Sequence, residues 1–267
     1  MIGDFRGKNV LVTGGTMGIG LATALAFGRR GADCTLTYKW GSADEDEVRR
    51  AFAEAGAPEP SLVQADVARA EETDRVLAQM RVRHPHVEVF VSNVSQTVLV
   101  ESPADYTARA LFQSIQYSAW PFVDHTFRIR EIFGRYPRYV VGISSTGVDQ
   151  FSQGYDLMAA SKAVMETLCR YLNYRLYDED TRINVIRTRS VRTASFRTAF
   201  GSDFEAFARR FTRDRHFVDV GEVADAAVAL CSGLMDGVRG QVLTVDRGTS
   251  FFDNLMRLYD ERETLQL

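Results

Sequence analysis

Short apolar runs alternate with segments of helical periodicity from one end of this chain to the other. The apolar runs lack polar alternation, which is typical of strands buried on both faces of a sheet. Because helical segments separate these runs, we predict a doubly wound α/β fold with a parallel sheet between two helical layers. No linker or repeat interrupts the pattern, so we expect a single domain over residues 1–267. The expected strands are 8–13, 34–38, 61–64, 87–92, 138–143, 182–187 and 241–245.

Two stretches depart from the regular helical pattern. Pro121 lies inside the stretch 106–133, and a proline within a helix predicts a kink or break there. Segment 189–216 is long and irregular, which is usual for a functional loop, so we expect a substrate lid. A simple packed helix is the alternative for its phenylalanines, Phe196, Phe200, Phe204, Phe207 and Phe211. The expected helices are 19–30, 44–55, 70–83, 106–133, 154–177 and 220–231.

Charge and cysteine usage narrow the class of protein. The formal net charge is -3 with both signs interspersed, which argues against nucleic acid or an anionic membrane as the main partner. The chain has neither a signal-peptide pattern at its start nor an apolar window long enough to span a membrane. Its three cysteines are far apart and show no metal-ligand spacing, so we expect reduced thiols, no metal and a cytoplasmic protein.

A glycine-rich loop separates the first expected strand from the first expected helix. It reads Thr13-Gly14-Gly15-Thr16-Met17-Gly18-Ile19-Gly20. Glycines at this place let the backbone approach a pyrophosphate, and the helix N-terminus supplies unpaired N–H groups. A tight turn with nothing bound is the alternative. Because the loop begins a doubly wound pattern, we predict that it binds a dinucleotide.

The end of the second expected strand indicates which dinucleotide. An acidic residue usually stands there to hold the ribose 2′-hydroxyl, but residues 38–42 contain no carboxylate. Lys39 and Ser42 would suit a 2′-phosphate, so we predict NADPH and leave NADH open; a solvated Lys39 is the alternative. We expect the acidic run 44–47 to stabilise the N-terminus of its own helix.

These motifs, in this order, resemble the short-chain dehydrogenase/reductase family over essentially the whole chain, which implies a Rossmann fold. Further matches are Ser92-Asn93-Val94-Ser95, Ile143-Ser144-Ser145 and Ser161-Lys162. The resemblance implies that Asp66 contacts adenine, Asn93 lies near the adenine ribose and Thr193 contacts the nicotinamide end. The residues implied to bind the cofactor are Gly14, Thr16, Met17, Gly18, Ile19, Gly20, Lys39, Asp66, Val67, Asn93, Lys162, Val191 and Thr193.

The expected active site departs from the main pattern of that family. The usual Tyr-x-x-x-Lys spacing would place a tyrosine at position 158, where this chain has Met158. Tyr155 precedes Lys162 by seven residues, and this spacing is similar to that of enoyl-acyl-carrier-protein reductases, a divergent branch. The helix-four asparagine of the family falls at Gln116. The Pro-Gly pair before the nicotinamide contact is replaced by Arg189-Ser190, and the late Asp-Gly-Gly by Asp246-Arg247-Gly248.

The proposed chemistry assigns a role to each catalytic candidate. Lys162 would hold the nicotinamide ribose and supply a positive field, and Tyr155 would hydrogen-bond or protonate a substrate oxygen. A solvated Lys162 and a packing Tyr155 are the alternatives. Ser145 would bond the substrate oxygen or only satisfy the backbone, and both readings stay open. We expect a structural role for Ser144.

The sequence therefore predicts an NADPH-dependent reductase of an α,β-unsaturated acyl thioester or related enone, in fatty-acid or polyketide biosynthesis. A carbonyl reductase using Ser145, Tyr155 and Lys162 is one alternative, and a nucleotide-binding protein without turnover is another. The substrate would be a small molecule or a carrier-bound acyl group. The family resemblance implies a homotetramer packed through the helices 106–133 and 154–177.

Overall fold

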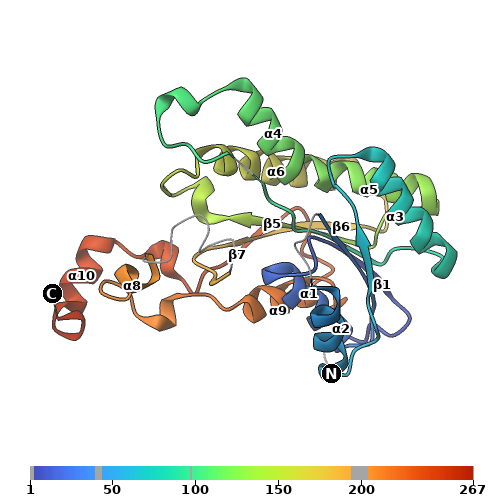
Figure 1. Ribbon diagram of the computed structural model, residues 1–267, viewed down its shortest axis with the longest axis horizontal. Helices are drawn as coiled ribbons and strands as arrows, with labels where there is room; N and C mark the ends of the chain where they lie inside the picture. Colours follow the sequence, from blue (N-terminus) through green and yellow to red (C-terminus); the bar gives the residue numbers. More distant parts are fainter. Residues whose placement is uncertain (1–2, 40–43, 97, 194–203, 267) are drawn as a thin grey trace.

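A single seven-stranded parallel sheet forms the centre of the computed structural model, with strand order β3-β2-β1-β4-β5-β6-β7 (Figure 1). The structure describes residues 3–39, 44–96, 98–193 and 204–266. The strands are β1 (Asn9–Thr13), β2 (Asp33–Tyr38), β3 (Ser61–Gln64), β4 (Val89–Ser92), β5 (Tyr139–Ser145), β6 (Arg182–Thr188) and β7 (Val242–Val245). The order reverses between β1 and β4, so the doubly wound prediction is confirmed.

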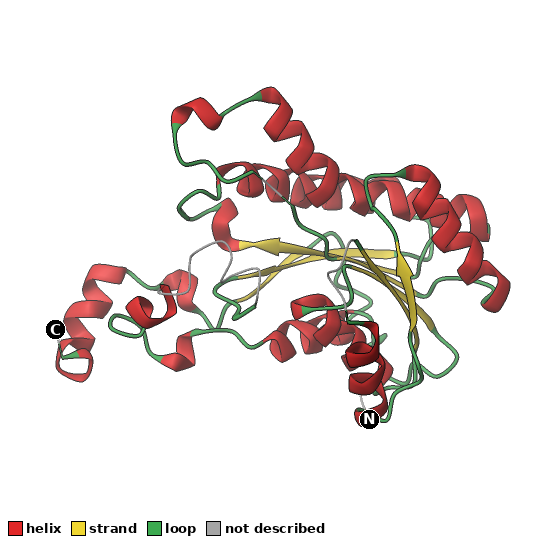
Figure 2. Cartoon of the chain, in the orientation of Figure 1, coloured by secondary structure: helices red, strands yellow, loops and turns green. Residues whose placement is uncertain are grey.

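Two layers of helices cover the two faces of the sheet (Figure 2). One layer contains α1 (Gly18–Gly28), α2 (Glu45–Glu54) and α9 (Val220–Leu230). The other contains α3 (Ala70–Arg83), α4 (Ala108–Ser118), α5 (Trp120–Phe133) and α6 (Asp156–Arg175). Each layer packs its apolar side chains against the strands in its own buried cluster, the larger one lying under α1 and α9.

The strands and most helices lie within a few residues of their predicted positions, and the predicted interruption at Pro121 is confirmed. The chain there forms two helices, α4 and α5, which meet at Ala119, and Pro121 lies in the first turn of α5. The C-terminal helix α10 (Asn254–Leu265) was not predicted. It lies beside the short helix α8 (Phe204–Ala208), at one end of the molecule away from the sheet (Figure 1).

The lid prediction falls partly outside the described residues. Positions 194–203, which include Phe196 and Phe200, are among the residues that the structure does not describe. The described remainder holds α8 and a short 3₁₀ turn, Asp214–His216. Phe207 and Phe211 contact each other there, with ring centroids 5.0 Å apart.

The glycine loop connects β1 to α1 as predicted, and its conformation depends on three glycines. Gly14 and Gly18 have φ values of +62° and +54°, which a residue with a Cβ rarely adopts. Gly20 is needed for space, because a Cβ there would lie 2.1 Å from the carbonyl oxygen of Gly14. The first turn of α1 can therefore pack directly against the loop. In this position the N–H groups of that first turn face the carboxyl edge of the sheet.

This close approach gives the first prediction. Gly20→Ala should displace the loop and weaken dinucleotide binding by at least ~10-fold, while lowering the melting temperature by several degrees, since overpacking costs about 1–3 kcal/mol. Gly237→Ala is the matched control, because a Cβ at Gly237 meets no atom within 4 Å. Isothermal titration calorimetry and thermal melts of both variants check it. Wild-type binding by Gly20→Ala would show that the loop tolerates the extra carbon.

Candidate active site

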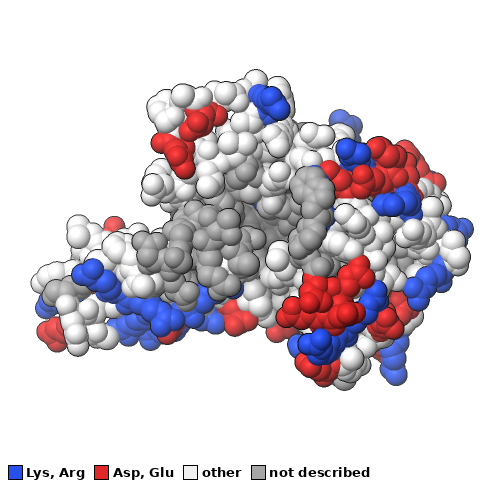
Figure 3. Space-filling view, viewed as in Figure 1, with Lys and Arg blue, Asp and Glu red and all other residues white. Residues whose placement is uncertain are grey.

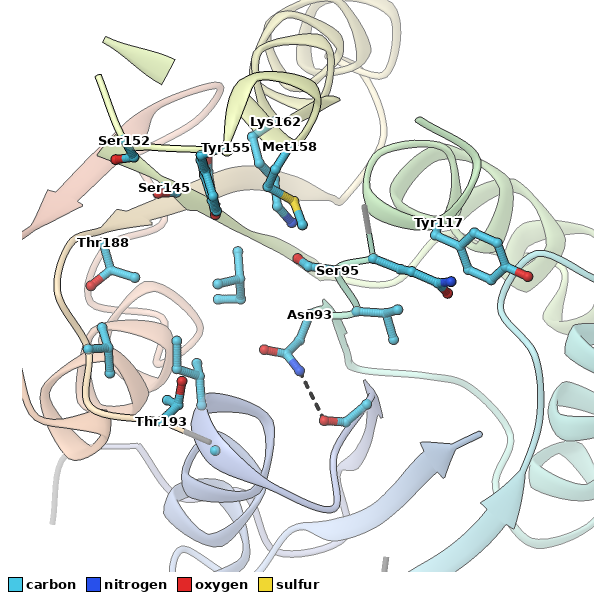
Figure 4. Close-up of a pocket in the computed structure, with 18 of the residues that line it drawn as sticks. Asn93, Ser95, Tyr117, Ser145, Ser152, Tyr155, Met158, Lys162, Thr188 and Thr193 are labelled. Atoms are coloured by element: carbon cyan, nitrogen blue, oxygen red, sulfur yellow. Dashed lines mark hydrogen bonds between the residues drawn. The ribbon is translucent and has the colours of Figure 1, made fainter. Parts of the chain in front are cut away.

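A pocket of about 1240 Å³ lies at the carboxyl ends of the strands, where ligands bind in open α/β sheets. It extends from the glycine loop, past the ends of β4 and β5, to the start of α6 (Figure 4). Its charged lining residues are Lys39, Lys162, Arg189 and Glu101. Among the described residues, the basic side chains that line the pocket outnumber the acidic ones, although Lys39 is already paired with Asp66.

The pocket brings together almost all of the residues that the sequence predicts for the site. The predicted residues that line it are Gly14, Thr16, Met17, Gly18, Ile19, Lys39, Val67, Asn93, Ser145, Tyr155, Lys162, Val191 and Thr193. Two predicted residues do not line it. Gly20 packs behind the loop, and Asp66 lies in an adjoining smaller pocket.

Asn93 fixes the glycine loop from the end of β4. Its side-chain amide donates to the carbonyl oxygens of Thr13 and Gly14, at 3.1 and 3.0 Å. Figure 4 marks one of these bonds with a dashed line. Its backbone N–H donates to the hydroxyl of Thr13. On the opposite side of the loop, the Thr193 side chain lies close to Gly18. The loop is thus held between the ends of β4 and β6 before any ligand binds.

Tyr155 is the N-cap of α6, immediately before the first helical residue. Its ring lies against Gly147, where a Cβ would come within 2.6 Å of the ring, so only glycine leaves room there. Ser145 lies beside Tyr155 and accepts a hydrogen bond from the Gly147 N–H at 3.2 Å. Burial raises the pKa of Tyr155, and the Ser145 contact opposes this only in part. The phenol is therefore a protonated hydrogen-bond donor at neutral pH.

Lys162 lies two turns into α6 and is only 2% exposed. Its Nζ donates to the backbone carbonyl of Ser118 at 3.4 Å. That carbonyl lacks its usual helical partner because the chain breaks between α4 and α5, and the Phe122 N–H bonds to Ala119 instead. Burial lowers the pKa of Lys162 to about 7, although the nearby Glu166 carboxylate raises it.

Glu166 links α6 to the ends of two strands. It accepts a 2.6 Å hydrogen bond from Ser144 on β5 and a 2.9 Å hydrogen bond from Arg187 on β6. Arg187 also pairs with Asp149, just after β5. Such a buried carboxylate requires these partners, and the network fixes α6 against the strands. The structural role expected for Ser144 agrees with this contact.

The residues that depart from the family pattern take unusual conformations or contacts. Ser190 has φ +52°, a left-handed conformation that favours glycine. Arg189 donates to the carbonyl oxygen of Thr249 at 3.2 Å. Gln116 is exposed and does not line the pocket, so the α4 group that faces Lys162 is the carbonyl of Ser118.

Lys39 lines the pocket, but it is already paired. Its Nζ lies 2.5 Å from Asp66 and 2.9 Å from the Tyr117 hydroxyl. Ser42, the second residue predicted for the 2′-phosphate, lies outside the described residues. As expected, the acidic run 44–47 caps its own helix: Asp44 accepts from the Glu47 N–H, and acidic side chains gather over α2 (Figure 3).

The rim of the pocket near Tyr155 carries apolar side chains beside the polar Gln150, Ser152 and Gln153. The lining side chains there include Leu99, Val100, Phe151, Met158 and Phe204. Phe151 is 90% exposed, so this end opens to solvent beside a large apolar side chain. Met158 occupies the position of the usual family tyrosine and is buried. The pocket therefore offers apolar side chains beside Tyr155, mixed with polar ones.

The glycine loop, the switch between β1 and β4 and the Tyr155–Lys162 pair define a nicotinamide-dependent oxidoreductase. A family model described as enoyl-(acyl carrier protein) reductase matches residues 14–250. The chain belongs to the short-chain dehydrogenase/reductase family, in the group that this model describes. Its cofactor is a nicotinamide dinucleotide.

A relative named as an enoyl reductase and one named as a hydroxysteroid dehydrogenase both match nearly the whole chain. It is 27% identical to enoyl-acyl-carrier-protein reductase (NADH) FabI of Escherichia coli, over 93% of this chain and 96% of the relative. It is 28% identical to 3beta-hydroxysteroid dehydrogenase 1 of Eggerthella lenta, over 94% and 97%. The fold matches that of actinorhodin polyketide ketoreductase with NADPH, with a TM-score of 0.80 at 23% identity over 92% and 98%.

Among the described residues, no helix meets the length and hydropathy needed to cross a membrane. The described part of the chain also contains no group of three or more His, Cys, Asp or Glu side chains placed to hold a metal ion. The three cysteines are free and buried.

The burial of Lys162 gives the second prediction. Because its pKa is lowered in the folded protein, the ammonium destabilises the fold below about pH 7, and the cost disappears as pH rises towards the unfolded value. Lys162→Met should therefore raise the free energy of unfolding at pH 6 by up to ~4 kcal/mol, while abolishing turnover. Lys8→Met is the control, since Lys8 is 41% exposed and pairs with Glu88. Urea denaturation at pH 6 and pH 9 measures both. A destabilised Lys162→Met protein at pH 6 would contradict the prediction.

Proposed function

We propose that this protein is an NADPH-dependent reductase of α,β-unsaturated acyl thioesters or related enones. The observation that carries the proposal is the place of Tyr155, which lies before the first turn of α6 and seven residues from Lys162. The apolar side chains at the rim beside Tyr155, Leu99, Val100 and Phe151, support an acyl chain as the substrate. A small-molecule or carrier-bound thioester, from fatty-acid or polyketide biosynthesis, is consistent with both features.

The residues of the pocket fit a dinucleotide. The positive φ values of Gly14 and Gly18, and the contact between Gly20 and Gly14, leave a backbone cradle that side chains would fill. Thr193 lies across this cradle, and Asn93 supports it from below. Lys162 would hold the nicotinamide ribose, since its ammonium lines the pocket two turns below Tyr155. The bound cofactor supplies the hydride.

Tyr155 and Lys162 would act on the thioester carbonyl oxygen. Hydride addition to the β-carbon moves the electron pair of the double bond towards this oxygen, which takes enolate charge. The Tyr155 hydroxyl donates a hydrogen bond to the oxygen, and the field of the Lys162 ammonium stabilises the charge. A proton from solvent would then reach the α-carbon, so that the product is the saturated thioester.

The spacing favours a carbon–carbon double bond over a ketone. In ketone reduction the hydride reaches the carbon that bears the oxygen, whereas in enoyl reduction it reaches a carbon two bonds further away. The side chain that hydrogen-bonds the substrate oxygen must then lie further from the nicotinamide. Moving the tyrosine from position 158 to 155 shifts it by three residues, or ~4.5 Å along a helix, in that direction.

A carbonyl reductase is the second candidate, because Ser145 and Tyr155 lie next to each other at the pocket wall (Figure 4). The hydroxyl groups of Ser145 and Tyr155 could both donate hydrogen bonds to a ketone oxygen. The similarity to a hydroxysteroid dehydrogenase is in line with this alternative. The buried Met158 speaks against it, since the place of the usual tyrosine carries no proton donor.

The proposed preference for NADPH over NADH is based on Lys39. The Escherichia coli relative does not supply it, since that enzyme is named for NADH. Lys39 follows β2 directly at the pocket wall, and residues 38 and 39 carry no carboxylate that would repel a 2′-phosphate. We also propose a homotetramer packed through α4, α5 and α6, as the family resemblance implies.

The third prediction separates the role of Tyr155 from its packing. Tyr155→Phe keeps the ring against Gly147 and removes the hydroxyl, so kcat should fall at least ~100-fold while the Kd for NADPH changes less than ~3-fold. Met158→Leu, a volume-conserving change at the same wall, should retain most activity. Steady-state kinetics and fluorescence titration with NADPH provide both readouts. Wild-type turnover by Tyr155→Phe would exclude Tyr155 as the proton donor.

The fourth prediction concerns the reaction itself. The protein is incubated with deuterated NADPH and either an α,β-unsaturated or a β-keto thioester of equal chain length. We expect deuterium on the β-carbon of a saturated product, detected by mass spectrometry and NMR, and no reduction of the keto compound. A hydroxyacyl product with the enoyl compound untouched would identify a ketoreductase. NADPH binding without turnover of either would contradict both candidates.

A further inference from the structure

Three side chains close a triangle at the adenosine end of the pocket. The Lys39 ammonium lies 2.5 Å from the Asp66 carboxylate and 2.9 Å from the Tyr117 hydroxyl. The Tyr117 hydroxyl in turn donates to Asp66 at 3.2 Å. The three residues come from the end of β2, the segment after β3 and the last turn of α4. Each of the three polar groups therefore contacts the other two.

The triangle stands in the wall between two pockets. Lys39 and Tyr117 line the main pocket, whereas Lys39 and Asp66 line an adjoining pocket of about 410 Å³. Tyr117 lies at the end of the main pocket away from Tyr155 and Lys162 (Figure 4). A change in this triangle can therefore alter the adenosine end without touching the catalytic residues.

The ion pair in the triangle is well formed and mostly shielded. The side chains of Lys39 and Asp66 are 20% and 11% exposed. Burial lowers the pKa of Lys39, but the hydrogen bonds to Asp66 and Tyr117 outweigh burial and leave the pKa raised. Burial likewise raises the pKa of Asp66, but hydrogen bonds from Lys39, Ala68 and Tyr117 leave it lowered. Both groups are thus charged at neutral pH, and the positive charge of Lys39 is balanced by Asp66.

We propose that Asp66 and Tyr117 form a latch on Lys39 that sets the selectivity between NADP(H) and NAD(H). Lys39 can bind a 2′-phosphate only if its ion pair with Asp66 is broken. The free energy gained from the phosphate is therefore reduced by the loss of that ion pair. A ribose with a free 2′-hydroxyl binds with the latch closed. The inference rests on the proposed role of Lys39. It adds that the preference for NADP(H) is weaker than it would be if Asp66 and Tyr117 did not bind Lys39.

Other cations nearby do not replace Lys39 in this arrangement. Arg69 and Arg75 line the smaller pocket. Arg75 donates to the carbonyl oxygen of Gln64 at 2.7 Å, and Arg69 is 63% exposed beside Glu72. Neither lines the main pocket, where the ribose would lie. Of the basic side chains that the structure describes, Lys39 is the one that lines both pockets.

Two nucleotides that differ only in the 2′-phosphate isolate the effect. Isothermal titration calorimetry measures the affinity of the full chain for adenosine 2′,5′-bisphosphate and for 5′-AMP, and the ratio of the two affinities cancels any contact with adenine. Asp66→Asn should raise this ratio at least ~5-fold, because the competing carboxylate charge is gone. Tyr117→Phe, which keeps the ring, should raise it ~2- to 3-fold. Glu71→Gln removes an exposed carboxylate from the first turn of α3 and should leave it unchanged.

Lys39→Met separates this inference from the proposed cofactor. If Lys39 holds the 2′-phosphate, the ratio in Lys39→Met falls towards one, and Asp66→Asn in that background has no further effect. A ratio that collapses in Lys39→Met but stays at the wild-type value in both Asp66→Asn and Tyr117→Phe would overturn the latch alone. A ratio unaffected by Lys39→Met would overturn the latch together with the predicted preference for NADPH, without bearing on the enoyl chemistry.

Discussion

Lys162 is almost fully buried at the wall of the pocket, and much of the surrounding structure fixes its amine there. Removing an ammonium from water costs several kcal/mol unless partners replace the lost hydration. The Ser118 carbonyl is one partner, and it is free to accept because Pro121 and the break at Ala119 end the hydrogen-bonding pattern of α4. Glu166, one turn further along α6, contributes a negative field.

The same partners fix the catalytic wall as a unit. Glu166 is satisfied by Ser144 and Arg187, so α6 is bound to the ends of β5 and β6. Those strand ends carry Ser145 and, just beyond, Ser190. Tyr155 begins α6 and packs on Gly147 in the turn that follows β5. The position of the phenol relative to Lys162 thus follows from how one helix is tied to two strands.

How far the sequence predicts this structure depends on whether a feature is local. The strands, the interruption at Pro121, the glycine loop and the pocket positions of Tyr155, Ser145 and Lys162 follow from periodicity, local geometry or family spacing. The Ser118 carbonyl could not be predicted, because a backbone acceptor has no residue signature. The pairing of Lys39 with Tyr117 joins residues 78 positions apart, so sequence reasoning assigned Lys39 to a phosphate without seeing its existing partners.

The state of the Lys162 amine tests this account most directly. The chain has three lysines, so the side-chain ¹³Cε signals can be assigned with single Lys→Arg variants and followed by NMR from pH 5 to pH 11. In the protein without cofactor, we predict that the Lys162 signal titrates near pH 7, while the Lys39 signal stays protonated to higher pH than a free lysine. A Lys162 signal that titrates near pH 10.5 would show a solvated amine and contradict the buried arrangement.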